Sequence, residues 1–161
     1  MTKATASFLV DTNIWLDMLL GRPNGKISSA LIVRANARDD FMAVTASQLK
    51  DIFYVVGQEL KRRARLEEGA MSTAHASSIN EIAWSCLSYV QKQAMVIDEG
   101  LSEHCEASTL RAQCADYEDA ILMACARRAK MDFIVTNDKQ LLAQSAIRAI
   151  TPKQYLEAYA V

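Results

Sequence analysis

The sequence is poor in the residues that interrupt helices and strands. Its 161 residues include two prolines and five glycines, and no repeat or low-complexity tract divides them. Because proline and glycine punctuate turns and linkers, their scarcity favours one helix-rich domain over residues 1–161. A hydrophobic content of 51% is enough for such a domain to bury a core.

The chain also lacks a charge excess, a long apolar run and a cysteine framework. Its formal net charge of -1 gives no overall attraction to nucleic acid, so such a partner would need a local basic patch. No apolar run reaches the roughly 20 residues of a membrane span, and that in "MTKATASFLV" is too short for a signal peptide. Cys86, Cys105, Cys114 and Cys125 have no CxxC spacing. We therefore expect reduced, mostly buried thiols and a cytoplasmic protein without a membrane partner.

Short apolar runs alternate with longer stretches of helical periodicity. The runs are "SFLV" before position 11, "FMAV" at 41–44, "AMVI" at 94–97, "DFIV" at 132–135 and "AIRAI" at 146–150. Helices are predicted over 13–20, 27–38, 47–66, 71–92, 101–111, 117–130 and 138–145. The tail "TPKQYLEAY" predicts a closing helix with Thr151 as its cap and Pro152 at its first position. This alternation predicts an α/β fold with a mostly parallel sheet covered on both faces. The long helical stretch over 47–92, with a break near Gly69, is predicted to form a helical arm outside the sheet.

Aspartates follow two predicted strands and lie near the start of two predicted helices. Asp11 directly follows "SFLV", Asp138 follows "FIVTN", and Asp51 lies near the start of the helix after "FMAVTAS". Because ligands of open parallel sheets bind beyond the carboxyl ends of the strands, these three are expected at one edge. Asp119 begins a helix that leads into a strand, which places it at the opposite edge unless the start of that helix projects over the crevice.

Helix capping is the competing explanation for these acids. Asp116 is followed three residues later by Asp119 in "DYEDAILMA", as in a capping box, and either Asp138 or Asn137 can cap "KQLLAQ". Asp11 can cap a helix that begins at position 13. Capping is the favoured interpretation for Asp116 and Asp138, and Glu118 is expected to face solvent in the first turn.

Capping does not explain why several acids should meet at strand ends. It is weakest for Asp119, which lies against the apolar stretch "AILMA". Carboxylates that lie a few ångströms apart repel one another unless a cation lies among them. A set of oxygen ligands without clustered histidine or cysteine indicates Mg²⁺ or Mn²⁺ rather than zinc.

Four segments occur in an order and spacing that make the pattern specific. They are "FLVDTNIWLDMLLGR", "VTASQLKDIFYVV", "DYEDAILMACARRAKMDFIVTNDKQL" and "ITPKQYLEAY". Together they resemble a PIN domain, the metal-dependent ribonuclease fold of VapC-type toxins and RNA-processing nucleases. The resemblance covers nearly the whole chain. It implies a three-layer α/β sandwich with a parallel five-stranded sheet of order 3-2-1-4-5, and it brings the "DYEDA" helix start over the acidic crevice.

The resemblance also implies roles for individual residues. Asp11, Asp119 and Asp138 match the first, third and fourth metal ligands of the family, and Asp116 matches an additional acid that binds metal or only caps. Asp51 stands where the family usually has glutamate, and its shorter side chain would bind through water or need a closer helix. The hydrogen-bonding groups around the site fall at Thr12, Asn13, Thr136 and Asn137.

The implied activity is hydrolysis of phosphodiester bonds in single-stranded RNA with one or two Mg²⁺ or Mn²⁺ ions. The catalytic residues would be Asp11, Asp51, Asp119 and Asp138. The resemblance further implies a toxin with an antitoxin partner, and a homodimer through the apolar stretch "IWLDMLL".

Contacts with RNA are predicted from charge and aromatic side chains. The basic run "KRRAR" would serve if it lined the crevice, although charge runs on helices are usually solvated faces. It supplies Lys61, Arg62, Arg63 and Arg65. Trp15 and Tyr54 are candidates for stacking on bases, with a core position favoured for Trp15.

Two other functions stay open at this point. A phosphatase of the haloacid dehalogenase class would need an aspartate at position 13, where this chain has Asn13. A catalytically degenerate PIN domain that binds RNA or protein is disfavoured by Asp11, Asp119 and Asp138 but left open by Asp51. Nucleotide-binding enzymes are disfavoured because the chain has neither a Walker loop nor a GxGxxG motif.

Overall fold

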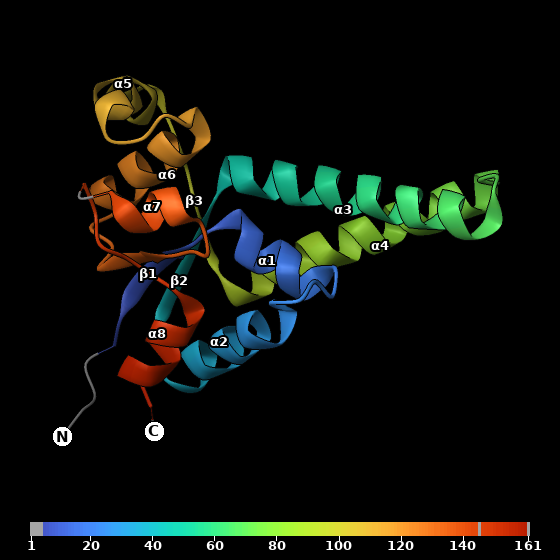
Figure 1. The fold of residues 1–161 in the computed structure, drawn as a ribbon, viewed down its shortest axis with the longest axis horizontal. Helices are drawn as coiled ribbons and strands as arrows, with labels where there is room; N and C mark the ends of the chain where they lie inside the picture. Colours follow the sequence, from blue (N-terminus) through green and yellow to red (C-terminus); the bar gives the residue numbers. More distant parts are fainter. Residues whose placement is uncertain (1–4, 145, 161) are drawn as a thin grey trace.

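Strands and helices alternate along the chain (Figure 1). The computed structural model describes residues 5–144 and 146–160. In chain order the elements are β1 (Ser7–Val10), α1 (Thr12–Leu19), α2 (Gly25–Ala37), β2 (Phe41–Thr45), α3 (Ala46–Glu68), α4 (Thr73–Gln93), β3 (Met95–Ile97), α5 (Leu101–Thr109), η1 (Leu110–Ala112), α6 (Tyr117–Arg128), β4 (Phe133–Val135), α7 (Lys139–Ala143), β5 (Ala149–Ile150) and α8 (Pro152–Ala158). Each predicted strand and helix is found, with its ends displaced by a few residues. The end predicted at 145 lies outside the described residues.

The five strands form one parallel sheet in the order β3-β2-β1-β4-β5. The central strand β1 pairs with β2 in the register Ser7↔Phe41 and with β4 in the register Phe8↔Phe133. The outer strands β3 and β5 pair in parallel with β2 and β4. This confirms the α/β class and the strand order that the resemblance implied.

Helices cover both faces of the sheet. Phe8 and Val10 of β1 point into a core shared with α1–α4 and α8. Leu9, Ala43 and Ile134 point into a second core shared with α5, η1, α6 and α7. Figure 1 shows α6 and α7 on one side of β1, and α2 and α8 on the other. Because both faces are buried, the inner strands read as continuous apolar runs rather than as alternating patterns.

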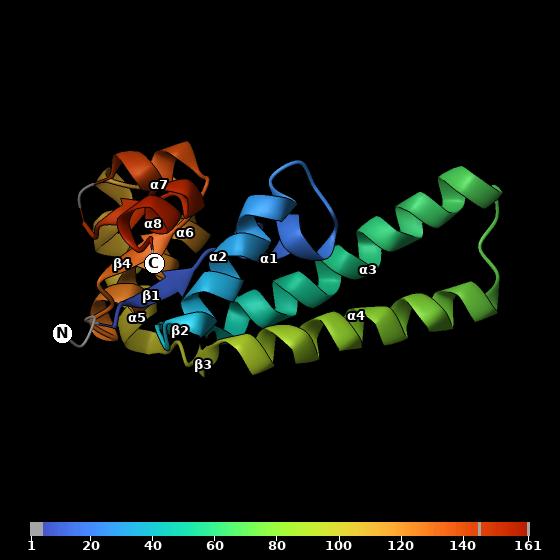
Figure 2. The ribbon, with the colours of Figure 1, turned by 90° about the horizontal axis from the view of Figure 1, so that it is seen from below.

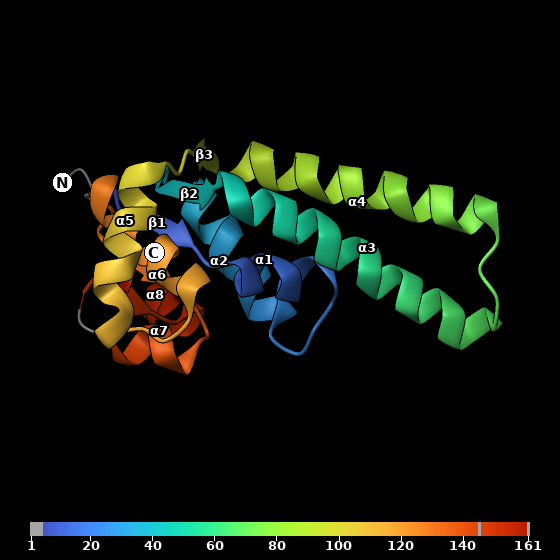
Figure 3. The ribbon, with the colours of Figure 1, turned by 90° about the horizontal axis from the view of Figure 1, so that it is seen from above.

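Two long helices, α3 and α4, extend away from the sheet as an arm, which Figure 2 and Figure 3 show from opposite sides. They pack along each other, and the rings of Phe53 and Trp84 lie 5.1 Å apart. Gly69 ends α3 with a φ of 75°, a left-handed conformation that suits glycine. The arm predicted over 47–92 with a break near Gly69 is confirmed.

Helix α1 packs inside the chain and not on its surface. Ile14, Trp15 and Leu16 are buried in the first core. They are therefore not available for the homodimer face predicted from "IWLDMLL". Trp15 is a core residue, as favoured, and does not provide a stacking surface for bases.

Two predictions drawn from composition have different outcomes. No helix within the described part of the chain is long and apolar enough to cross a membrane. The four cysteines are free, but only Cys114 and Cys125 are buried, while Cys105 is exposed and Cys86 half-buried. The expectation of mostly buried thiols therefore holds for two of the four.

Candidate functional site

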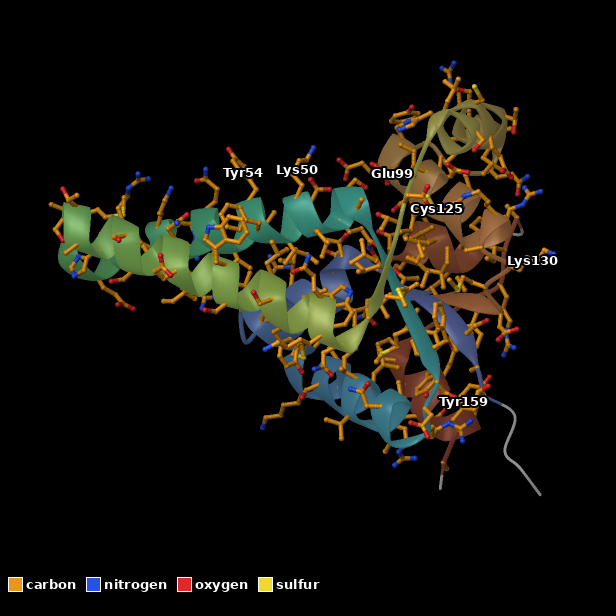
Figure 4. The ribbon with its side chains drawn as sticks, turned by 180° about the vertical axis from the view of Figure 1, so that it is seen from behind. Lys50, Tyr54, Glu99, Cys125, Lys130 and Tyr159 are labelled. Atoms are coloured by element: carbon orange, nitrogen blue, oxygen red, sulfur yellow. The ribbon has the colours of Figure 1, made fainter. Side chains whose placement is uncertain are left out.

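An acidic hollow of about 630 Å³ lies at the carboxyl ends of the central strands, between α3 and the start of α6. Of the described residues that line it, every charged one except Lys50 is acidic: Asp11, Asp51, Glu99, Asp116, Glu118, Asp119 and Asp138. Figure 4 shows Lys50 and Tyr54 projecting from one side of α3, with Glu99 near the start of that helix on the same side. The fold thus gathers acids from distant parts of the chain at the predicted edge.

Asp11 lies at the floor of the acidic hollow and is 6% exposed. It is the N-cap residue of α1, although its side chain makes no capping hydrogen bond of standard geometry, and, against the larger effect of burial, the backbone N–H groups of Thr12 and Asn13 help to lower its pKa. Thr136 Oγ1 donates to Asp11 Oδ2 at 2.7 Å and accepts from the backbone N–H of Asp138 at 2.9 Å. Burial raises the pKa of Asp11, and the hydroxyl of Thr136 offsets only part of that rise.

Asp119 lies in the first turn of α6, half-buried at the same edge. The start of α6 therefore projects over the crevice, as the resemblance implied and strand order alone did not. Burial, followed by the charges of Asp11, Asp116 and Asp138, raises the pKa of Asp119 to about 7. Without a cation the charged form of this carboxyl group is therefore disfavoured near neutral pH.

Asp116 and Asp138 both cap helices. Asp116 Oδ1 accepts from the N–H groups of Glu118 and Asp119 at 2.9 and 3.2 Å. Asp138 Oδ1 accepts from the first-turn N–H groups of α7 at 2.7 and 3.1 Å. Both capping predictions are confirmed, and the cap of α7 is Asp138 rather than Asn137. Within the described residues neither Oδ2 makes a hydrogen bond, so each cap keeps one oxygen for another ligand.

Asp51 lines the same hollow from α3. Whether its carboxylate acts through water or by direct contact stays open between the two predicted modes.

The polar residues predicted around the site have different surroundings. Thr136 is buried and joins the ends of β1 and β4, while Thr12 and Asn13 line the hollow. The Nδ2 atom of Asn137 is buried and has no hydrogen-bond partner among the described residues. Asn137 is not among the described residues that line the hollow.

Gln48 is a structural residue of the site that sequence reasoning missed. Its Nε2 donates to the carbonyl of Val10 at 2.9 Å and to Thr12 Oγ1 at 3.1 Å. Its Oε1 accepts from the N–H of Thr45 at 2.8 Å, which completes a capping box. Gln48 thereby ties the ends of β1 and β2 together under the hollow. The spacing of Thr45 and Gln48 is the signal in the sequence that could have found it.

Two further polar pairs line the hollow, one between α3 and the loop after β3 and one between α5 and α6. Ser47 donates to Glu99 at 2.7 Å, and His104 Nδ1 lies 2.9 Å from the hydroxyl of Tyr117. Tyr117 is 54% exposed, so its ring stands at the rim with its hydroxyl held in place.

The donor set fits a hard divalent cation, although its geometry is not yet that of a metal site. Within the described chain no three acidic, histidine or cysteine side chains are already arranged to hold an ion. The available donors are carboxylate oxygens, and the charges of Asp11, Asp116 and Asp138 add to the effect of burial in raising the pKa of Asp119. A cation would remove this repulsion, and rotation of the side chains would bring them onto it.

The predicted RNA-binding run does not line the acidic hollow. Its first residue, Lys61, is ten residues beyond Asp51 on α3, about 15 Å along the helix axis. Arg62 and Arg63 both donate to Glu59 at 2.8 Å, and Arg63 also donates to a backbone carbonyl in the turn after α1. Residues 61–65 are therefore not among those that line the acidic hollow, which was the condition for their predicted role there.

Comparisons with known proteins give a family and a fold. A family model described as PIN domain matches residues 7–140. No curated protein matches the chain.

Three solved structures share the fold at low sequence identity. VapBC2 from Rickettsia felis, bound to a DNA fragment from its promoter, is 15% identical over 89% of this chain and 97% of that chain, with a TM-score of 0.61. A toxin–antitoxin complex from Klebsiella pneumoniae is 19% identical over 91% and 98%, with a TM-score of 0.59. PAE2754 from Pyrobaculum aerophilum is 19% identical over 96% and 90%, with a TM-score of 0.58.

Proposed function

Because the chain belongs to the PIN domain family, we propose that it is an endoribonuclease that hydrolyses single-stranded RNA with Mg²⁺ or Mn²⁺. The observation that carries this proposal is the meeting of Asp11, Asp116, Asp119 and Asp138 in one hollow. These acids come from three separate segments of the chain, and capping accounts for only two of them. In this proposal residues 1–161 act as one domain.

PIN domains generally use divalent metal ions. Asp11 and Asp119 would hold the ion, Asp138 and the free oxygen of Asp116 would complete the set, and Asp51 would act through water or by direct contact. When bound, such an ion supplies a water of lowered pKa and stabilises the charge that develops on the phosphate.

The remaining residues position these ligands. The hydroxyl of Thr136 keeps one oxygen of Asp11 in a fixed direction. Gln48 fixes Thr12 beside it. Lys50, the one cation among the described lining residues, stands on the wall of the hollow and can pair with a phosphate of the substrate.

An antitoxin partner is part of the proposal. Two of the three similar structures are complexes of the toxin–antitoxin type, which supports such a partner here. Homodimerisation stays a prediction, but most of the apolar stretch that suggested it is buried in the first core.

The test is cleavage of labelled single-stranded RNA by the purified protein with Mn²⁺. We expect the wild-type protein to cut, and EDTA or Asp119→Asn to abolish cutting. Glu118→Gln is the matched control, since it removes a neighbouring charge that is exposed, and it should keep most of the activity. Cleavage that survives the chelator or Asp119→Asn would refute the proposal. RNA binding without cleavage on several RNAs would instead support a binding module.

A further inference from the structure

A second hollow, of about 390 Å³, adjoins the acidic one on the side of the arm. We call it the basic hollow. It is lined by Arg22, Tyr54, Val55, Gln58, Glu59, Arg62 and Arg65. Tyr54 and Val55 also line the acidic hollow, so the two are continuous across these side chains.

The basic hollow has the opposite charge balance to its neighbour. Arg22, Arg62 and Arg65 line it, Glu59 is the one acid among its described lining residues, and Arg22 also lies 3.7 Å from Asp17. A strand of RNA meets repulsion from the acidic hollow at every phosphate that no cation neutralises. Binding of an RNA strand therefore needs positive charge near the acidic hollow, and the basic hollow next to it supplies that charge.

Tertiary contacts build this hollow. Arg22 lies in the turn between α1 and α2, whereas Arg62 and Arg65 lie on α3. Arg63 Nη2 donates to the carbonyl of Leu20 at 2.9 Å, which ties this turn to the arm. Glu59 accepts from Arg62 Nε and Nη2 through both of its oxygens at 2.8 Å, which fixes one edge of that guanidinium. The remaining N–H groups of Arg62 are left for a ligand.

Tyr54 stands where the two hollows meet and is 64% exposed. Its side chain projects outward from α3, as Figure 4 shows. A large aromatic ring at the join of a phosphate-neutralising surface and a candidate catalytic centre suits the stacking of a nucleobase. An acidic peptide would satisfy the arginines but has no base to place on this ring.

We propose that the basic hollow is a phosphate-binding subsite for single-stranded RNA. Arg22, Arg62 and Arg65 hold a phosphate outside the acidic hollow, and Tyr54 stacks on the base between the two. This inference rests on the proposed ribonuclease function and specifies its substrate as a strand that continues toward the arm. Positions 54 and 62 are eight residues apart, about 12 Å along α3, so we expect a dinucleotide held at the acidic centre to gain little from the arginines.

The first experiment measures binding of a single-stranded RNA of about twelve nucleotides in EDTA, by fluorescence anisotropy over a range of salt concentrations. We expect Arg22→Ala with Arg65→Ala to weaken binding about tenfold and to lower the salt slope by about 0.7 for each phosphate that is no longer neutralised. Tyr54→Ala should weaken binding without changing that slope. Lys61→Ala is the matched control, because it removes a positive charge from the same helix outside both hollows, and it should have little effect.

The second experiment compares cleavage of the long RNA with that of a dinucleotide in the presence of Mn²⁺. The arginine substitutions should lower kcat/KM for the long RNA and leave the dinucleotide unaffected. Equal losses for Lys61→Ala and the arginine variants, or RNA binding that does not change, would overturn the subsite. Loss of binding to an acidic peptide with unchanged RNA binding would also overturn it. Absence of any cleavage by the wild-type protein, with the binding pattern intact, would refute the nuclease and retain the subsite.

Discussion

Replacing Asp119 by asparagine tests how strongly the acidic hollow destabilises the protein in the absence of metal. The pKa of Asp119 is raised from 3.8 to about 7 by burial and by the carboxylates of Asp11, Asp116 and Asp138. A group whose charge is this unfavourable in the folded state makes folding harder whenever it is ionised. Asparagine has nearly the same shape and carries no charge, so it should stabilise the metal-free protein.

The size of the effect follows from the shift in the pKa of Asp119. A rise of about three units corresponds to an upper limit of about 4 kcal/mol, at roughly 1.36 kcal/mol per unit. Asp119 is only half-buried, and solvent screening reduces this figure. We therefore expect Asp119→Asn to raise the free energy of unfolding by about 1–2 kcal/mol. For a chain of this length that corresponds to a Tm higher by roughly 2–8 °C.

The stabilisation should depend on pH in a defined direction. Below pH 3.8 Asp119 is protonated in both the folded and the unfolded states, and the variant gains nothing. Between pH 3.8 and about 7 the folded state holds a proton that the unfolded state has released, so the free energy of unfolding of the wild-type protein falls as pH rises. The advantage of Asp119→Asn should grow across this window and be complete above pH 7.

The assay is urea unfolding in EDTA at several pH values between 5 and 8.5, for the wild-type protein, Asp119→Asn and the control Glu118→Gln. Glu118→Gln should change the free energy of unfolding by only a few tenths of a kcal/mol. Glu118 is exposed, and its repulsion from the other acids is offset by its favourable position in the first turn of the helix dipole. Added Mg²⁺ should stabilise the wild-type protein more than Asp119→Asn. A variant that is less stable than wild type above pH 7, or a difference independent of pH, would show that Asp119 is not held in a repulsive cluster.

Three further substitutions test how the site is supported. Gln48→Ala should cost about 2–3 kcal/mol in chemical denaturation, because it leaves a buried carbonyl at the end of β1 and a buried N–H without partners; full stability would contradict its role under the hollow. Thr136→Val keeps the shape of the side chain but removes the hydroxyl that donates to Asp11. Calorimetry should then show Mg²⁺ binding weakened about tenfold, and an unchanged affinity for Mg²⁺ would contradict a role for this hydrogen bond. Tyr155→Phe removes the hydroxyl that donates to Asp40 at the opposite end of the sheet, and it should cost about 1–2 kcal/mol with RNA cleavage by the folded protein unchanged. Lost cleavage in folded Tyr155→Phe would mean that the two ends of the sheet are coupled.

Much of the fold could be predicted because the inner strands of a covered parallel sheet are apolar on both faces. Phe8 and Leu9 point to opposite cores, and both are buried, so the run shows in the sequence without any tertiary information. The start of α2 could not be placed in this way. Gly25 packs against the carbonyl of Asp17, where a Cβ atom would lie 2.5 Å away, so this helix begins at a contact between α1 and α2.

The acids of the site differ in how far the sequence could place them. Asp11 and Asp138 follow strands, so the rule for parallel sheets puts them at the functional edge. The place of Asp119 depends on where α6 begins relative to the sheet. Only the family resemblance predicted that this helix start projects over the crevice. Capping and metal binding look like rival roles for Asp116 and Asp138 in the sequence, yet each carboxylate has two oxygens and the cap uses one. The cap therefore aims the second oxygen, and a capping pattern is not evidence against a ligand.

The basic hollow shows why the run "KRRAR" is not sufficient to locate a binding surface. Charge density along the sequence marks four residues close together, but a helix sends adjacent side chains in different directions. Arg63 points back to the turn after α1, while Arg62 and Arg65 line the hollow. The third arginine, Arg22, is isolated in the sequence and reaches the hollow through that turn. A phosphate site of this kind is defined by the side chains that converge on it. Here they converge because Arg63 contacts Leu20, a tertiary contact that the charge pattern of the sequence does not show.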